Sequence, residues 1–228
     1  MSGLWEILIA PRSAFASLRE RPRWGLAFLV AAALGTAGAL LQVPAREHVA
    51  GLLLTSDAGT GSALAAMSDA RRRQAEDFAL AVVHWTWLAY PLLIALAIGL
   101  ATSVMLLATT LAGSRGGAAR LFALAANVAI VNFGIGYLAL GAIMTLRGSG
   151  DFASDRDLLI ALPSLAWLAP QASPALATVL AQINPFALWS CVLLVLGLGE
   201  VADAPLGAAL PAAVLISFGG AALAPLAR

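Results

Sequence analysis

The chain has 228 residues, of which 61% are hydrophobic and only 11% are charged, and its mean hydropathy is +0.90. A soluble domain carries roughly 25% charged residues, so this composition excludes an ordinary soluble enzyme and indicates a chain embedded in a lipid bilayer. The formal net charge of +1 argues against a nucleic-acid partner, and a single cysteine permits neither an intrachain disulfide nor a multi-cysteine metal site.

Residues 1–23 predict an amphipathic segment at the cytoplasmic surface of the membrane. Its apolar residues at helical spacing are Leu4, Leu8, Phe15 and Leu18. Charged residues, mostly arginines, surround this apolar face, which is typical of a helix in the headgroup region. Pro11 suits the first turn of a second short helix, so we expect a break there.

Residues 24–228 then predict an all-α, polytopic membrane bundle of five transmembrane helices. Their approximate bounds are 24–43, 80–112, 118–146, 185–199 and 205–227. The second span belongs to an uncharged run that would extend about 52 Å as a single helix. A tilted or protruding helix that changes direction near Tyr90 and Pro91 accounts for this length.

The segments between the spans predict loops and short helices. Residues 44–77 are polar, with a Ser/Thr/Gly-rich part and three consecutive arginines, and predict a solvated loop with a short helix before the second span. Residues 147–183 are broken by three prolines and predict interfacial helices and loops. The stretch from Gly113 to Gly117 predicts a tight turn.

The arginines beside the spans predict the orientation. Four arginines directly precede the first span, and two more lie in or just after the turn that follows the second. These are the positions that the positive-inside rule weighs most. We therefore expect a cytoplasmic N-terminus and a C-terminus on the periplasmic or extracellular side.

Two stretches of the chain carry a recognisable pattern. They read LWEILIAPRSAFASLRERP from Leu4 to Pro22 and NPFALWSCVLLVLGLG from Asn184 to Gly199. Together with the glycine turn after the second span, they resemble the Yip1 family in its bacterial branch. The resemblance implies five transmembrane helices, a cytoplasmic N-terminus and a bacterial inner-membrane location.

The same resemblance says little about mechanism. Eukaryotic members of the family are trafficking factors that associate with Rab-type GTPases through a cytosolic N-terminal region. Only about 23 residues precede the first span here, so that role does not carry over. Some bacterial members are thought to accompany ABC-type export systems.

Four polar residues are candidates for an intramembrane site or the lining of a pathway: His84, Asn127, Asn132 and Glu200. His84 stands in an aromatic cluster and either binds a ligand or relays a proton, or it is an incidental member of an interfacial aromatic belt. The two asparagines either bond to a neighbouring helix or line a polar cavity. Glu200 is either a proton or cation site or an ordinary solvated carboxylate in a hairpin turn.

The turn after the second span is a candidate site for a lipid headgroup or another anion. Its residues are Arg115, Gly116, Gly117 and Arg120. Glycine amides can form an anion-binding nest, although a plain turn is the alternative. No nucleotide-binding, metal-binding or catalytic motif occurs in the chain, so the sequence predicts no cofactor and no enzymatic activity.

The sequence favours a non-enzymatic scaffold or accessory subunit of a membrane assembly, with a transport or export system as one setting. Small residues in every span support this hypothesis, because they let helices approach closely. The alternative is a transporter or channel for a small solute or lipid. Expected partners are the bilayer and either another membrane protein or a second copy of the chain. The two hypotheses differ in whether His84, Asn127 and Asn132 line one common cavity.

Overall fold

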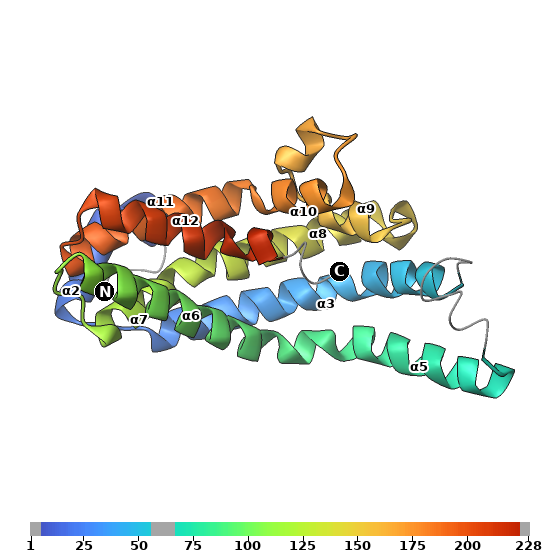
Figure 1. The fold of residues 1–228 in the computed structure, drawn as a ribbon. Helices are drawn as coiled ribbons and strands as arrows, with labels where there is room; N and C mark the ends of the chain where they lie inside the picture. The colour runs from blue at the N-terminus through green and yellow to red at the C-terminus, as the bar shows by residue number, and fades with distance from the viewer. Residues whose placement is uncertain (1–5, 56–66, 224–228) are drawn as a thin grey trace.

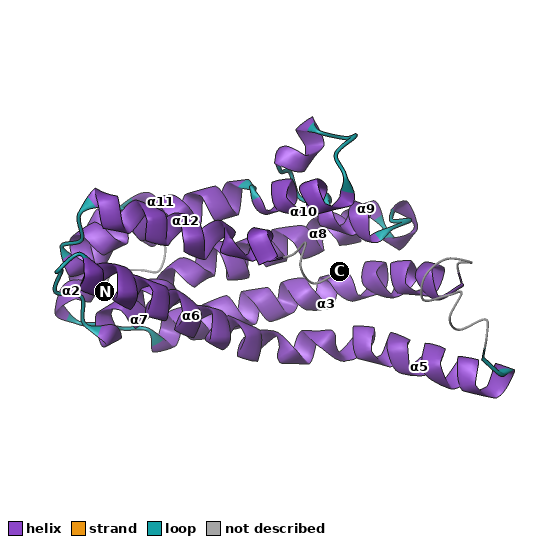
Figure 2. Ribbon diagram, in the orientation of Figure 1, coloured by secondary structure: helices purple, strands orange, loops and turns teal. Residues whose placement is uncertain are grey.

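A computed structural model describes residues 6–55 and 67–223 of the chain. Within these residues every regular element is a helix, and the long helices lie along one another as a bundle (Figure 1, Figure 2). Four helical runs are long and apolar enough to cross a membrane: Gly25–Thr55, Asp69–Leu111, Ala118–Arg147 and Pro185–Ala202. The prediction of an all-α bundle with membrane-spanning helices is confirmed in this form.

The N-terminal segment forms two short helices that lie at one end of the bundle, α1 (Glu6–Ile9) and α2 (Pro11–Glu20). Pro11 occupies the first helical position of α2, where its missing N–H is not needed. Phe15 and Leu18 are buried, and α2 packs against α7 and α11. The apolar face of α2 that the sequence assigns to the membrane surface is therefore covered by the bundle.

Helix α3 (Gly25–Thr55) is longer than the first predicted span. The sequence predicts a loop from Pro44 onward, but the helix continues through Pro44 to its end. A proline inside a helix loses one backbone hydrogen bond, and packing against a neighbouring helix can compensate for that loss. Helix α8 (Tyr137–Arg147) packs along α3 and provides this support. The Ser/Thr/Gly-rich part of the predicted loop falls mostly on residues 56–66, which lie outside the described residues.

The second span is part of a longer, interrupted helix. It consists of α5 (Asp69–Trp85), a 3₁₀ turn η1 (Thr86–Ala89) and α6 (Tyr90–Leu111). The 3₁₀ turn lies where the sequence predicts a change of direction. Helix α5 extends past the rest of the bundle at the end opposite to α2 (Figure 1), and none of its residues is buried.

The third run contains a stretch of non-standard helix. It comprises α7 (Ala118–Ala129), the π-helix η2 (Ile130–Gly136) and α8. A π-helix is wider than an α-helix, and such segments occur frequently at functional sites. The structure therefore places the irregular backbone in the middle of this run.

The stretch of predicted short helices and loops contains η3 (Ser149–Asp151), α9 (Asp155–Leu159), η4 (Leu165–Leu168) and α10 (Pro174–Gln182). A hairpin of α11 (Pro185–Ala202) and α12 (Leu206–Leu223) closes the described chain. Asn184 caps α11, since its side-chain oxygen accepts hydrogen bonds from two backbone N–H groups of the first turn at 3.1 and 3.0 Å.

Candidate functional site

A cavity of about 660 Å³ lies between α3, η1, η2, α8, α12 and the short helices α9 and α10. Its lining is more apolar than polar, but it has more polar residues than the second cavity described below, and we call it the polar cavity. Its polar lining residues include Gln42, Arg46, Asn132, Tyr137, Asp155 and Ser217. A volume of this size lies within the range of roughly 300–1,000 Å³ that is typical of small-molecule sites.

The centre of the polar lining is a pair of residues one turn apart on α3. The Nη2 atom of Arg46 donates a hydrogen bond to Oε1 of Gln42 at 2.8 Å. Gln42 is 0% exposed, and its Nε2 atom has no hydrogen-bond partner among the described residues. None of the ion pairs in the described part of the chain includes Arg46. The pair thus presents a cationic guanidinium and an unsatisfied amide donor beside the cavity.

A second cavity, of about 550 Å³, lies between α6, α7, α11 and α12, and its lining is mainly apolar. It includes Ala97, Ala101, Val128 and Leu194. Ser190 also lines it, is 4% exposed, and has a hydroxyl oxygen without a hydrogen-bond partner in the described residues. A ligand that has a hydrocarbon chain and a few polar atoms would be complementary to this lining.

The two cavities adjoin at the π-helical segment. Four residues line both of them: Asn132, Phe133, Ile216 and Ser217. Of the four polar residues selected from the sequence, Asn132 is the one that lines these cavities. The polar and apolar cavities therefore share a wall of partly buried residues.

His84 lies outside both cavities. Its Nδ1 atom is 2.7 Å from Oε1 of Glu47, and both side chains are partly exposed. Its ring makes an edge-to-face contact with Trp85, with 5.0 Å between the ring centroids. The structure thus pairs His84 with a carboxylate on α3 rather than with either asparagine.

Asn127 connects α7 to the segment that precedes α3. Its Nδ2 atom donates hydrogen bonds to the carbonyl oxygens of Ala123 at 2.7 Å and Arg23 at 3.2 Å, and the side chain is 5% exposed. Neither cavity includes it. This arrangement matches the alternative in which the asparagine bonds to a neighbouring segment.

We expect Asn127→Ala to lower the free energy of unfolding by about 1–2 kcal/mol, because it leaves the Arg23 carbonyl without this donor. Titration of the purified protein with sodium dodecyl sulfate, followed by circular dichroism, measures the change. Thr110→Ala on the exposed surface of α6 is the control and should be neutral. A neutral Asn127→Ala would contradict this role.

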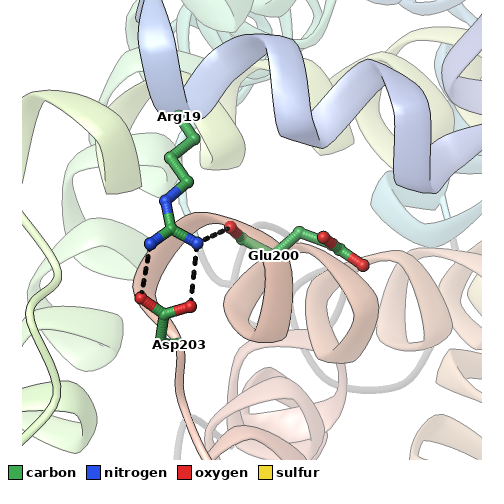
Figure 3. Close-up of polar contacts among 3 residues, drawn as sticks. All are labelled: Arg19, Glu200 and Asp203. Carbon is green, nitrogen blue, oxygen red and sulfur yellow. Dashed lines mark hydrogen bonds and ion pairs between the residues drawn. The ribbon is translucent and has the colours of Figure 1, made fainter.

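Glu200 and Asp203 lie at the turn between α11 and α12, where α2 contacts the hairpin (Figure 3). The guanidinium of Arg19 donates two hydrogen bonds to the carboxylate of Asp203, at 2.8 and 2.7 Å, and a longer one to the Glu200 carbonyl at 3.5 Å. The side chains of Arg19 and Asp203 are 47% and 59% exposed. The contact therefore orients α2 at an exposed end of the bundle, and neither carboxylate lines the cavities.

Asp203 also has a backbone role, since it ends α11 in the left-handed region at φ +51°. We expect Asp203→Asn to lower the free energy of unfolding by at most about 1 kcal/mol. An exposed ion pair contributes little to stability, and asparagine tolerates this backbone conformation. Asp203→Ala should cost more than Asp203→Asn, because alanine adds backbone strain of about 1 kcal/mol. The same detergent titration ranks the two variants, and equal costs would assign the whole effect to the ion pair.

The glycine turn between α6 and α7 ends α6. Gly113 has φ +69°, and its N–H and that of Ser114 donate to carbonyl groups in the last turn of α6. The remaining candidates of this turn are Arg115, Gly116, Gly117 and Arg120. Arg115 is exposed, whereas Gly116 packs against Thr109 and Ala202. The turn lies at the α2 end of the bundle, away from the polar cavity (Figure 1).

The sequence interpretation missed Gln42 and Arg46 as site residues. Gln42 was assigned to the end of a span and Arg46 to a loop, because Pro44 between them suggested a helix end. Their spacing of four positions carries the missing signal, since it brings both side chains to one face of a continuous helix. Among the described residues, no group of three or more His, Cys, Asp or Glu side chains is placed to hold a metal ion.

No protein-family model matches the chain, and searches of curated proteins and of solved structures find no match either.

Proposed function

We propose that this chain is a non-enzymatic, multi-pass membrane protein that binds a small solute or lipid in its two adjoining cavities and transports it. The observation that carries the proposal is the shared wall at η2. A polar cavity beside Arg46 and an apolar cavity among four helices meet there at Asn132 and Ser217. A transport protein needs such an interior site, whereas a scaffold does not.

The proposal includes five spans, with α12 as the fifth, and an N-terminal segment at the cytoplasmic membrane surface. The helical path from Gly25 to Arg46 is about 32 Å at ~1.5 Å per residue. This length matches the ~30 Å hydrocarbon core, so Arg46 would lie at the interface opposite to α2. The arginine distribution and the resemblance to the bacterial Yip1 family support a cytoplasmic N-terminus in an inner membrane.

The packing of the glycines also favours an interior site over a partner-binding face. Within α3 and α8, Gly38 and Gly141 lie at the helix crossing, and a Cβ atom at either position would collide with backbone of the other helix. A Cβ atom at Gly197 would likewise collide with Leu124. These small residues are used within the chain and do not need an external partner to explain them.

Cysteine accessibility tests the proposal. In a Cys191→Ser background, Asn132→Cys should react with a small, charged, membrane-impermeant thiol reagent, because water in the polar cavity reaches this position. The reaction should occur from the side of the membrane that faces α9 and α10. Labelling from that side would also report the orientation of the chain.

Two control positions keep the test specific. Ala123→Cys, at a fully buried position outside both cavities, should stay unlabelled. Leu96→Cys, at a 62% exposed position of α6 outside both cavities, should also stay unlabelled because lipid surrounds it in this proposal. If Asn132→Cys were as unreactive as these controls, the proposed cavity function would be abandoned.

Helix α5 favours a second candidate function, in which the chain is an accessory subunit of a membrane assembly. This helix extends past the bundle and has no buried residue (Figure 1). Arg71 and Arg73 are exposed on it. Affinity purification from native membranes tests this function: a membrane protein that co-purifies in stoichiometric amount, and is lost in Arg71→Glu/Arg73→Glu, would support it. Purification of the chain alone would remove this candidate.

A further inference from the structure

We infer that the two cavities together form a site for a single-chain anionic amphiphile, with its carboxylate or phosphate group at Arg46 and its hydrocarbon chain in the apolar cavity. This inference rests on the proposed function and specifies its ligand. Three features support it: the charge in the polar cavity, the lining of the apolar cavity and the connection between the two.

Arg46 supplies the positive charge that an anionic headgroup requires. The hydrogen bond to Gln42 uses one N–H of a guanidinium that has five, so further donors are available. The fully buried Nε2 of Gln42 adds a donor that no described residue satisfies. An unsatisfied buried donor is costly, and an acceptor supplied by a ligand removes that cost. Anionic oxygens suit both donors, and they form the stronger, charge-assisted hydrogen bond with arginine.

Among the described residues, no charged group forms an ion pair with Arg46. Asp155 lines the same cavity, but its side chain is exposed and the described ion pairs do not join it to Arg46. Glu47, the next residue on α3, contacts His84 instead. The guanidinium is therefore left to balance the charge of a ligand.

The apolar cavity has the lining and the volume for a hydrocarbon chain. Its volume of about 550 Å³ is bounded largely by alanine, valine, leucine and isoleucine side chains, which cannot hydrogen-bond to a polar solute. A hydrocarbon chain gains free energy on entering such a lining. One chain suits this volume, whereas the two chains of a phospholipid exceed it.

The residues common to both cavities connect the two. Asn132 and Ser217 line each cavity, so a molecule with its head at Arg46 passes these residues to place its tail between α6 and α11. Phe133 and Ile216 complete the shared lining with apolar surface. The lining changes from charged to polar to apolar in the order that an amphiphile requires.

The test measures binding to the full chain in nanodiscs of phosphatidylcholine, whose net charge is zero. Dansyl-undecanoic acid serves as the fluorescent probe. Its competitors share one chain length: hexadecanoate, hexadecyl phosphate, hexadecanol and hexadecyltrimethylammonium. We expect saturable probe binding, and we expect one or both anions to compete at least about 10-fold better than the alcohol or the cation. Comparing the two anions distinguishes a fatty acid from a lipid phosphate as the source of the headgroup.

Variants test which cavity binds the headgroup of the ligand and which binds its hydrocarbon chain. Arg46→Gln should weaken anion binding about 10-fold or more and leave hexadecanol binding unchanged. Arg71→Gln removes the same charge from the exposed surface of α5 and should bind like the unmodified protein. Ala101→Phe should fill the apolar cavity and weaken the anions and the alcohol alike. Arg46→Lys, which retains the charge, should recover a large part of the anion preference.

The outcomes separate this inference from the function on which it rests. Absence of saturable probe binding, equal competition by anion and alcohol, or an unchanged affinity in Arg46→Gln would each overturn the anionic-amphiphile assignment. If Asn132→Cys is nevertheless labelled, the cavity function stands with a different ligand. If Asn132→Cys is not labelled, the cavity function itself fails. Each variant is compared by gel filtration and detergent titration, so that a misfolded protein is not scored as a binding defect.

Discussion

Replacing Gly38 with leucine is expected to lower the free energy of unfolding by about 3 kcal/mol or more. A Cβ atom at this position would collide with the backbone of Tyr137 and Leu138, where α3 crosses α8. Backbone atoms cannot move aside by a change of rotamer, so the two helices have to separate. Since Tyr137 also lines the polar cavity, the same change should disturb that cavity.

Gly99→Leu is the matched control for this prediction. Gly99 lies on α6, and a Cβ atom there would have no neighbour within 4 Å. The free energy of unfolding of this variant should not fall, and it should rise by up to about 1 kcal/mol because leucine has a higher helix propensity than glycine. Titration with sodium dodecyl sulfate compares the two variants. If Gly38→Leu and Gly99→Leu had equal effects, the close crossing of α3 and α8 would be wrong.

Phe15→Ala is expected to release α2 from the bundle. Phe15 is 0% exposed and belongs to the same apolar cluster as Leu121 of α7 and Leu198 of α11. Truncating a buried phenylalanine costs about 3–5 kcal/mol. Because α2 packs against one end of the bundle (Figure 1), this cost should appear as local opening of residues 11–20 rather than as unfolding of the bundle.

Hydrogen exchange measures this local opening. The backbone amides of α2 should exchange at least about 100-fold faster in Phe15→Ala, because every 1.4 kcal/mol corresponds to a factor of ten. Phe78→Ala, at a 70% exposed position of α5, should leave the exchange of α2 unchanged. If the α2 amides exchanged rapidly in the unmodified protein and at the same rate in both variants, α2 would not be packed against the bundle.

Composition and hydrophobic run length were sufficient to predict the helical, membrane-spanning character of the chain. Local chemistry also identified several helix boundaries. Pro11 opens α2, Gly113 follows the end of α6 with a positive φ, and Pro185 opens α11. These signals are readable because each depends on a few neighbouring residues. Pro44 was misleading, because a continuing helix requires support from α8, which is distant in the sequence.

The candidate site could be predicted only in part. Asn132 was selected because polar residues in apolar helices need a partner or a cavity, and it lines both cavities. The other three candidates met the same criterion but lie outside the cavities. His84 contacts Glu47, Asn127 donates to the Arg23 carbonyl, and Glu200 lies at the α11–α12 turn. A polar residue in a span therefore indicates a contact without specifying which contact it is.

The sequence by itself determined what kind of environment each segment needs, because hydrophobicity, helix propensity and charge are properties of local residues. It thereby determined the all-α class of this protein and its membrane-spanning helices. Only the tertiary structure decided which polar groups meet and where space remains between the helices. Cavities arise from the packing of side chains far apart in the chain, such as Arg46 on α3, Asn132 on η2 and Ser217 on α12. No local pattern encodes that spatial arrangement.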